Sequence, residues 1–319
     1  MSDETVALGV EPAPGSARRR RRRHLGRTAL PYALLAPALA VIGLVLAYPL
    51  YKLVALSLQR YGLFELIRHQ GRFVGLDNYS QIVRDSQFWE VLLRTAVFTA
   101  VNVGLTMVLG TLIALLLTKL HVAMRLLLST GLVLVWAMPP VVSVNIWNWM
   151  VDYEFGVANW TLTKLHIGNF IHHEWFDDPR QGLAVVTAMV VWGAIPFVTI
   201  TVYAGLTQVP QSLVEAAELD GANALKVFRD ITFPLLKPIF VILTSLSVIW
   251  DFQVFNQIWI LRNTRPEPGY WLIGVYSFVE SFSVSNYGLG SAIAVAMVLV
   301  MFGATFFLVR HMVRAGEFE

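Results

Sequence analysis

One carboxylate, Asp251, lies deep inside an apolar stretch at about residues 237–260, where it could take part in ligand binding. It is about 14 residues into that stretch, roughly 20 Å along a helix that rises 1.5 Å per residue. An ionisable side chain at that depth in a membrane is energetically unfavourable and by default functional. Trp250, Gln253 and Asn256 add an aromatic face and hydrogen-bonding groups. We expect Asp251 to line a ligand pathway; a hydrogen bond or ion pair between helices is the alternative.

Two further sets of polar residues lie within or beside apolar stretches. Asn145 and Asn148 flank Trp147, and Tyr276 precedes the last stretch. Their amide and phenol groups can bond to ligand hydroxyls, so they are further candidates for the ligand pathway. Ordinary helix packing is the alternative for each of them.

Common catalytic and nucleotide-binding motifs are missing from the sequence. There is no G-x-x-x-x-G-K-[ST] segment, so we expect no ATP to bind through a P-loop. The sequence has no HExxH motif, no Ser/His/Asp nucleophile array and no cysteine. His172-His173-Glu174 lies near Asp177-Asp178, but no other spacing supports a metal site. We predict no catalytic, cofactor-binding or metal-binding residue, and no enzyme activity of this chain itself.

A polar segment at residues 208–238 separates two apolar stretches. After Pro210 we expect a short helix with Ser212 as its N-cap and Glu215 three residues later at the capping-box position. Gly221 suits a helix end or a sharp turn. The arrangement predicts a short helix that could dock into a groove of another protein, or an ordinary interfacial helix.

The rest of this segment predicts a second short helix at Asn223–Asp230. Phe228 and Ile231 would pack back against the membrane helices. Pro234 and Pro238 would end the segment where the next apolar stretch begins.

Six apolar stretches are long enough to cross a bilayer, which takes about 20 residues. They cover about 30–56, 92–118, 126–150, 182–207, 237–260 and 288–310. Backbone inside hydrocarbon must satisfy its own hydrogen bonds, so these stretches should be helices, bent or broken at Pro139-Pro140 and at Pro196. With 56% hydrophobic and 14% charged residues, against about 25% charged in soluble proteins, the chain is predicted to be an all-α polytopic membrane protein.

The N-terminal region carries an unbroken run of arginines, Arg18–Arg23. We interpret residues 1–27 as a disordered basic tail whose charge holds the N-terminus in the cytoplasm; a nucleic-acid or lipid patch is the alternative. The following uncharged run, Thr28–Tyr51, is too long for a signal peptide and should be an uncleaved membrane helix. Six spans from 28–319 would then place the 208–238 segment and both termini in the cytoplasm. No nucleic-acid partner is expected.

Aromatic residues are frequent in the loops predicted outside the cell, at about 57–91, 151–181 and 261–287. They suit an interfacial belt or, alternatively, a docking surface for an extracellular partner.

The 208–238 segment resembles, position by position, the cytoplasmic EAA loop of binding-protein-dependent ABC importer permeases. The matching residues are Glu215, Ala216, Ala217, Asp220, Gly221, Ala222, Phe228, Ile231, Pro234 and Pro238. Weaker similarity to carbohydrate-uptake permeases extends over nearly the whole chain. It includes Phe73–Tyr79, Phe88-Trp89, Thr95, Phe98-Thr99, Trp136–Pro140, Trp149, Gly156, Asn159, Trp192, Pro196-Phe197 and Tyr203–Leu206. The loop and Arg310–Glu319 look more like the F-type than the G-type maltose-permease subunit, although eight spans and a large outer domain of some F-type members are absent.

This resemblance implies a subunit of an ATP-driven sugar importer in a bacterial cytoplasmic membrane, surrounded by membrane lipid. It implies a second homologous permease, two copies of an ATPase that binds ATP and Mg²⁺, and an extracellular sugar-binding protein. Glu215, Ala216, Ala217, Asp220, Gly221 and Ala222 would couple this chain to the ATPase. A di- or oligosaccharide would pass the polar residues inside the membrane.

Other functions would show different features in the sequence. Import of glycerol phosphate or a polyamine by the same machinery is one alternative; phosphate would call for a cluster of basic residues in the membrane. An integral-membrane transferase would need carboxylates or histidines grouped at one membrane face, and a self-contained secondary transporter would not carry the EAA-like loop. The identity of the sugar and of the partner chains is not encoded in any of these motifs.

Overall fold

The computed structural model describes residues 34–314, so the expected tail at 1–27 lies outside the described residues. They fall into two compact units that divide between Ala55 and Leu56. In the first unit the chain is helical from Leu34, with a π-helical turn η1 (Gly43–Ala47) followed by α2 (Tyr48–Ser57). This 24-residue helix has a mean hydropathy of 2.0, as the first predicted span requires.

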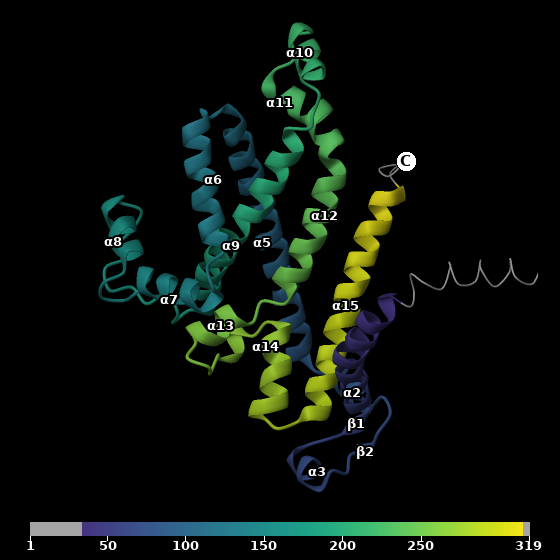
Figure 1. Ribbon diagram of the computed structural model, residues 1–319. Coiled ribbons are helices and arrows are strands. Elements are labelled where there is room, and N and C mark those ends of the chain that lie inside the picture. The colour runs from purple at the N-terminus through teal and green to yellow at the C-terminus, as the bar shows by residue number, and fades with distance from the viewer. Residues whose placement is uncertain (1–33, 315–319) are drawn as a thin grey trace, which may run out of the picture. The chain divides into compact units, whose positions relative to one another are not determined.

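The second unit is built from long apolar helices (Figure 1). α5 (Ser86–Lys119) and α9 (Pro179–Leu206) pack along each other, and α12 (Phe233–Phe252) and α15 (Tyr287–Arg314) complete the bundle. At the contact of α5 with α9, a Cβ on Gly110 would lie 2.7 Å from Cγ1 of Val198, so glycine allows the close approach. Hydrogen bonding of Thr199 Oγ1 to the Gly110 carbonyl at 3.2 Å ties the two helices there.

The third predicted span is a bent pair of helices. α6 (Val122–Trp136) and α7 (Pro140–Met150) meet at 102°, with the break at Pro139-Pro140. The expected break is therefore confirmed, and the single span at 126–150 becomes two segments. The described residues contain five helices that are long and apolar enough to cross a membrane, and six candidate spans if the bent pair counts as one. The predicted helical membrane fold is confirmed, with five to six spans. α9, in contrast, continues through Pro196 without a break.

Short elements connect the long helices at both ends of the second unit (Figure 1). At one end lie α10 (Gln211–Leu219), α11 (Ala224–Val227) and the π-helical turn η2 (Phe228–Thr232). Elements toward the other end are β1 (Gln59–Arg60), α3 (Leu63–Arg68), β2 (Arg72–Phe73), α4 (Asp77–Arg84), α13 (Asn256–Leu261), the 3-10 turn η3 (Pro268–Tyr270), α14 (Ile273–Phe278) and the π-helical turn η4 (Val279–Ser283). α8 (Val157–Lys164) lies to the side of the bundle, next to α7 (Figure 1).

Candidate functional site

A cavity of about 350 Å³ opens between α6, α7, α9 and α12, and it contains Asp251. The break at Pro139-Pro140 shapes it, because the end of α6 and the start of α7 both contribute to its wall. Its polar and aromatic lining residues are Trp136, Ser143, Trp192, Phe197, Ser247, Trp250, Asp251 and Gln257. Helices that are far apart in sequence therefore supply one common wall.

Asp251 lies one residue before the end of α12 and is only 4% exposed. Its Oδ2 atom has no hydrogen-bond partner among the described residues. A buried polar atom without a partner costs about 1–3 kcal/mol, and more if it is charged. The structure thus gives no support to the alternative of a hydrogen-bonded helix pair, and it leaves this carboxylate on the wall of a cavity.

Three aromatic rings contact one another in sequence on the wall of the same cavity and form an aromatic face. The Trp136 and Phe197 rings stack with centroids 6.2 Å apart and an interplanar angle of 19°. Phe197 also meets Trp250 edge-on at 5.2 Å. These rings come from α6, α9 and α12, so the face exists only when the three helices pack together. Aromatic faces beside hydrogen-bonding groups suit a ligand that has both C–H surface and hydroxyl groups.

Among the described residues, the wall of this cavity carries a single ionisable side chain. Asp251 is acidic, and no Lys, Arg or His lies among the residues that line this cavity. An anionic ligand would therefore meet a carboxylate with no cation to offset it, which is unfavourable in an environment of low dielectric constant. A neutral or cationic ligand avoids that repulsion.

Several predicted pathway residues lie away from the cavity. Gln253 Nε2 bonds to the Ile249 carbonyl at 3.1 Å and to Met301 Sδ at 3.5 Å. Helix residues that are two positions apart in sequence point roughly 200° apart around the axis. Gln253 and Asp251 therefore face opposite ways. Asn256 is exposed and does not line the cavity, whereas its neighbour Gln257 does.

Asn145 and Asn148 are also exposed on α7 and absent from the cavity wall. Asn145 Nδ2 bonds within its own helix, to the Val141 carbonyl at 2.9 Å. The same helix presents Ser143 to the cavity instead. Both amides lie on the second helix of the bent pair, and the 102° bend between α6 and α7 decides which side of α7 faces the cavity.

Tyr276 has a structural setting. Its hydroxyl donates to Asp85 Oδ2 at 2.8 Å, and its ring stacks on Trp271 at 5.4 Å. Burial raises the pKa of Tyr276, and the hydrogen bond to Asp85 adds to this effect. Since it ties α14 to the α4–α5 junction, the structure does not bring Tyr276 into the cavity with Asp251.

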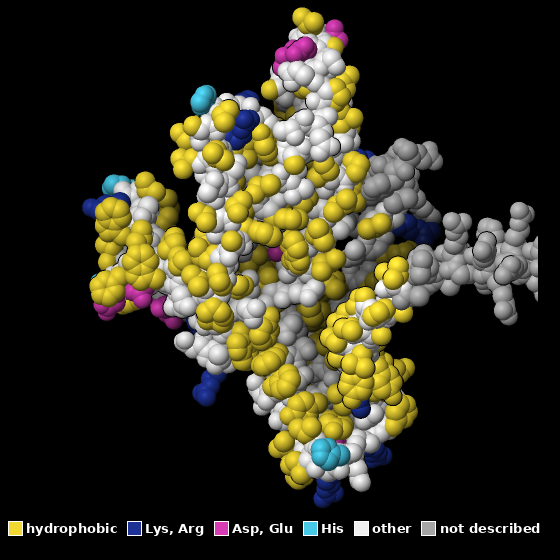
Figure 2. All heavy atoms as spheres, viewed as in Figure 1, with side chains coloured by type: hydrophobic (Ala, Val, Ile, Leu, Met, Phe, Trp, Pro, Cys, Tyr) yellow, Lys and Arg dark blue, Asp and Glu magenta, His cyan; other side chains and the backbone are white. Residues whose placement is uncertain are grey.

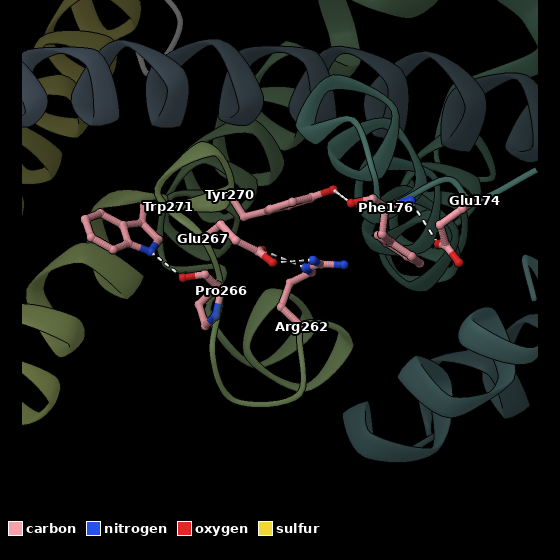
Figure 3. A network of polar contacts seen from close by, with 7 residues as sticks. All are labelled: Glu174, Phe176, Arg262, Pro266, Glu267, Tyr270 and Trp271. Atoms are coloured by element: carbon pink, nitrogen blue, oxygen red, sulfur yellow. Dashed lines mark hydrogen bonds and ion pairs between the residues drawn. The ribbon is translucent and has the colours of Figure 1, made fainter.

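A polar network holds the loop that follows α13 (Figure 3). Arg262 makes two hydrogen bonds to Glu267, at 3.0 and 2.5 Å, and its guanidinium lies 4.7 Å from the centroid of the Tyr270 ring. The bond from Arg262 lowers the pKa of Glu267, and burial raises the pKa of Tyr270 to about 12. Tyr270 then donates to the Phe176 carbonyl at 2.7 Å, which joins this loop to the segment before α9.

The histidines of the 151–181 loop take part in packing contacts. The His172 ring stacks on Tyr153 at 5.2 Å, and His173 Nε2 lies 2.6 Å from Gln181 Oε1. Within the described residues, no group of three or more His, Cys, Asp or Glu side chains is arranged to hold a metal ion.

The 208–238 segment begins differently from the expectation. Pro210, and not Ser212, is the N-cap of α10, and no side chain caps that end. The fixed φ of proline, here −60°, suits the residue that starts the helix. Ser212 therefore lies inside the helix, and the capping box predicted with Glu215 does not form.

Gly221 ends α10 as predicted. Its φ is +80°, in the left-handed region that glycine adopts freely. The Gly221 N–H donates to the Glu218 carbonyl at 3.0 Å, and the Ala222 N–H donates to the Ala217 carbonyl at 2.9 Å. This pair of bonds is the Schellman motif of helix C-termini.

The predicted second helix does not stand alone. Asn223 is the N-cap of α11: its Oδ1 accepts from the Lys226 N–H at 2.9 Å. The helix then continues through η2 into α12. Pro234 and Pro238 lie within this helical run and do not end the segment. The wider π-helical turn comes just before Pro234, where a proline ring would otherwise clash with the carbonyl four residues earlier. Phe228 and Ile231 are half-buried.

The EAA-like residues of α10 form an exposed surface. Glu215, Ala216, Asp220 and Gly221 are exposed, and Ala217 and Ala222 are half-buried. Leu219 and Leu225 are 90% and 75% exposed, a large apolar exposure for a segment that also carries acidic groups. Figure 2 shows hydrophobic and acidic side chains together at the α10 end of the second unit. A surface of this kind is typical of a protein–protein contact.

Comparison with known proteins gives a consistent picture. The family model described as "Binding-protein-dependent transport system inner membrane component" matches residues 106–314. The diacetylchitobiose uptake system permease protein DasB of Streptomyces coelicolor is 40% identical over 305 residues, covering 96% of this chain and 93% of that protein. The trehalose/maltose transport system permease protein MalF of Thermococcus litoralis is 32% identical over 273 residues, covering 85% and 90%.

A solved structure shares the fold. It is a chain of a bacterial alginate ABC transporter, crystallised with an alginate pentasaccharide-bound periplasmic protein. The TM-score is 0.73 at 17% identity, with 93% of this chain and 98% of that chain covered.

Proposed function

From the premise that this chain belongs to the family of binding-protein-dependent transport system inner membrane components, we propose that it is the permease subunit of an ATP-driven sugar importer. It would carry a di- or oligosaccharide across the cytoplasmic membrane. The observation that carries this proposal is the cavity between α6, α7, α9 and α12, in which an aromatic face lies beside the unpartnered carboxylate of Asp251.

The chemistry of the wall favours a sugar over a charged solute. Trp136, Phe197 and Trp250 can stack on the C–H faces of sugar rings, and Asp251 with Ser247 and Gln257 can bond to hydroxyls. A phosphorylated solute such as glycerol phosphate would require cations on the wall, and the described residues that line this cavity include no Lys, Arg or His. The names of two relatives, a diacetylchitobiose and a trehalose/maltose system, point to neutral sugars of the same class.

Energy would come from a partner that binds α10. The exposed surface formed by Glu215, Ala216, Asp220 and Leu219 is suited to a groove of a separate ATPase, which would bind ATP and Mg²⁺. The complex would hold two copies of that ATPase and a second homologous permease. A docked extracellular sugar-binding protein would deliver the sugar at the opposite end of the bundle.

Movement would pass from α10 to the cavity through one continuous helix. α11, η2 and α12 form a helical run from Ala224 to Phe252, and Asp251 lies almost at its far end. A shift of α10 on ATP binding would therefore displace the cavity wall. In this scheme the cytoplasm lies on the α10 side, as do both chain termini.

Substitution of Asp251 tests the proposed substrate pathway. Asp251→Leu removes every hydrogen bond from this position, and Asp251→Asn keeps the shape without the charge. In proteoliposomes that contain the full complex, we expect Asp251→Leu to lower uptake of labelled diacetylchitobiose, trehalose or maltose at least about tenfold, the equivalent of roughly 1.4 kcal/mol. ATPase activity stimulated by the binding protein should persist.

Gln253→Leu is the matched control, since Gln253 is two residues away and faces α15. It should transport normally. Failure of Asp251→Leu to insert or assemble would make Asp251 a structural residue, and normal uptake by Asp251→Leu would remove it from the pathway.

A further inference from the structure

A small hairpin between the first two spans exposes apolar and basic side chains together. It comprises β1, α3 and β2, residues 59–73. Phe64 and Ile67 of α3 are 75% and 69% exposed, and Phe73 is 72% exposed. Figure 2 shows hydrophobic, His and Lys/Arg side chains gathered at this end of the second unit. So much apolar exposure in so short a segment is typical of a contact surface.

The helix in this hairpin is amphipathic. A period of 3.6 residues places Leu63, Phe64 and Ile67 on one side of α3, and Glu65 and Arg68 on the other. Glu65 is held by the backbone, because its Oε2 accepts from the Gly62 N–H at 2.9 Å. This bond caps the first turn of α3 and keeps Glu65 on the polar side of the helix.

The strands of the hairpin contain an unbalanced pair of charges. Arg60 lies directly opposite Arg72 in the antiparallel register. Like charges at opposite positions destabilise a strand pair, and neither arginine makes an ion pair with another described residue. With Arg68, they give the hairpin three exposed arginines against the one carboxylate of Glu65. An anionic partner would relieve this repulsion.

The base of the hairpin lies at the end of a membrane span. The Gly288 N–H donates to the Tyr61 carbonyl at 3.0 Å, and the Tyr61 ring contacts the Tyr287 ring edge-on at 6.4 Å. Tyr287 is the first residue of the apolar helix α15. Tyrosines concentrate where a span meets the headgroup region, so α3, which begins two residues after Tyr61, lies within reach of that region.

We propose that this hairpin is an interfacial anchor: α3 inserts Leu63, Phe64 and Ile67 among the lipids of the leaflet opposite α10, while Arg60, Arg68 and Arg72 bind anionic phospholipid headgroups. Shallow insertion of an apolar side flanked by arginines is how interfacial helices bind membranes. The anchor would fix the α4–α5 junction against the bilayer, because Asn78 of α4 bonds to the backbone carbonyls of Ser57 and Gln59 at 2.8 and 2.9 Å.

The cysteine-free chain allows a direct test in the reconstituted full complex. Phe64→Cys is labelled with bimane in vesicles that contain phosphatidylglycerol or only phosphatidylcholine, with brominated-chain lipids as quenchers. Gln70→Cys, on the exposed loop after α3, is the matched control. We expect bimane at position 64 to be quenched by brominated lipid and bimane at position 70 to be quenched by aqueous iodide.

Replacement of Arg60 and Arg72 by Gln should weaken insertion at position 64 in phosphatidylglycerol vesicles, by about fivefold for each arginine, and should have little effect in phosphatidylcholine. Quenching at position 64 by iodide alone would overturn the proposal. A second result would also overturn it: bimane at position 64 is not quenched by brominated lipid, and the sugar-binding protein shields it from iodide. That result would make the hairpin a protein-docking surface.

Discussion

The Phe197 ring of α9 meets the Trp250 ring of α12 at 5.2 Å with an interplanar angle of 65°, one residue before the buried carboxylate of Asp251. This contact places an aromatic face and an acceptor on the same wall of one cavity. It is the relationship on which the proposed handling of a sugar depends.

Removal of one ring from this face should weaken transport without loss of assembly. Trp250→Leu keeps apolar volume but removes the stacking surface, so we expect uptake to fall about fivefold, the equivalent of roughly 1 kcal/mol. Uptake by the reconstituted complex is the measurement. Trp149→Leu is the control, because Trp149 is 59% exposed and does not line the cavity. Equal effects of the two substitutions would show that the aromatic face is not specific to transport.

The turn at Gly221 should be required for coupling. Gly221→Ala forces a Cβ into a φ of +80°, at a cost of about 1–2 kcal/mol, whereas Gly221→Asn is tolerated better in this region. We expect Gly221→Ala to reduce uptake and stimulated ATPase activity together, and Gly221→Asn to retain most of both. A Cβ there meets no atom within 4 Å, so backbone conformation alone is tested. Full activity of Gly221→Ala would contradict the importance of the turn.

The orientation of the chain can be tested with one cysteine. Asn223→Cys lies at the start of α11, beside the EAA-like surface. If that end faces the cytoplasm, a membrane-impermeant thiol reagent should label it only after cells are opened. Phe155→Cys, 74% exposed in the 151–181 loop, should react in intact cells and serves as the control. The reverse labelling pattern would invert the topology.

Tyr276 should matter for stability and not for transport. Tyr276→Phe removes the hydroxyl that donates to Asp85 at 2.8 Å, so we expect the free energy of unfolding to fall by about 1 kcal/mol. Thermal unfolding of the purified protein measures this, and uptake should remain close to normal. A large loss of uptake at unchanged stability would return Tyr276 to the substrate pathway.

The sequence itself determined the membrane spans, the break at Pro139-Pro140, the polar segment at residues 208–238 and the turn at Gly221. Runs without charge require helices inside a membrane, and Pro139-Pro140 and Gly221 have backbone restrictions that act locally. Asp251 could also be identified from the sequence, because an isolated carboxylate within a long apolar run is unusual. The same local reasoning failed at Ser212, where the fixed φ of Pro210 starts the helix two residues earlier.

Tertiary structure alone decided which residues share the cavity. Trp136, Phe197 and Trp250 lie on three helices, and their meeting depends on the 102° bend between α6 and α7 and on the close packing of α9. Gln253 is two residues from Asp251 yet faces α15, since neighbours in sequence diverge around a helix. Tyr276 bonds to Asp85, which is 191 residues away in the sequence, and so lies outside the cavity. Proximity of that kind arises from packing between segments, and no local pattern of residues encodes it.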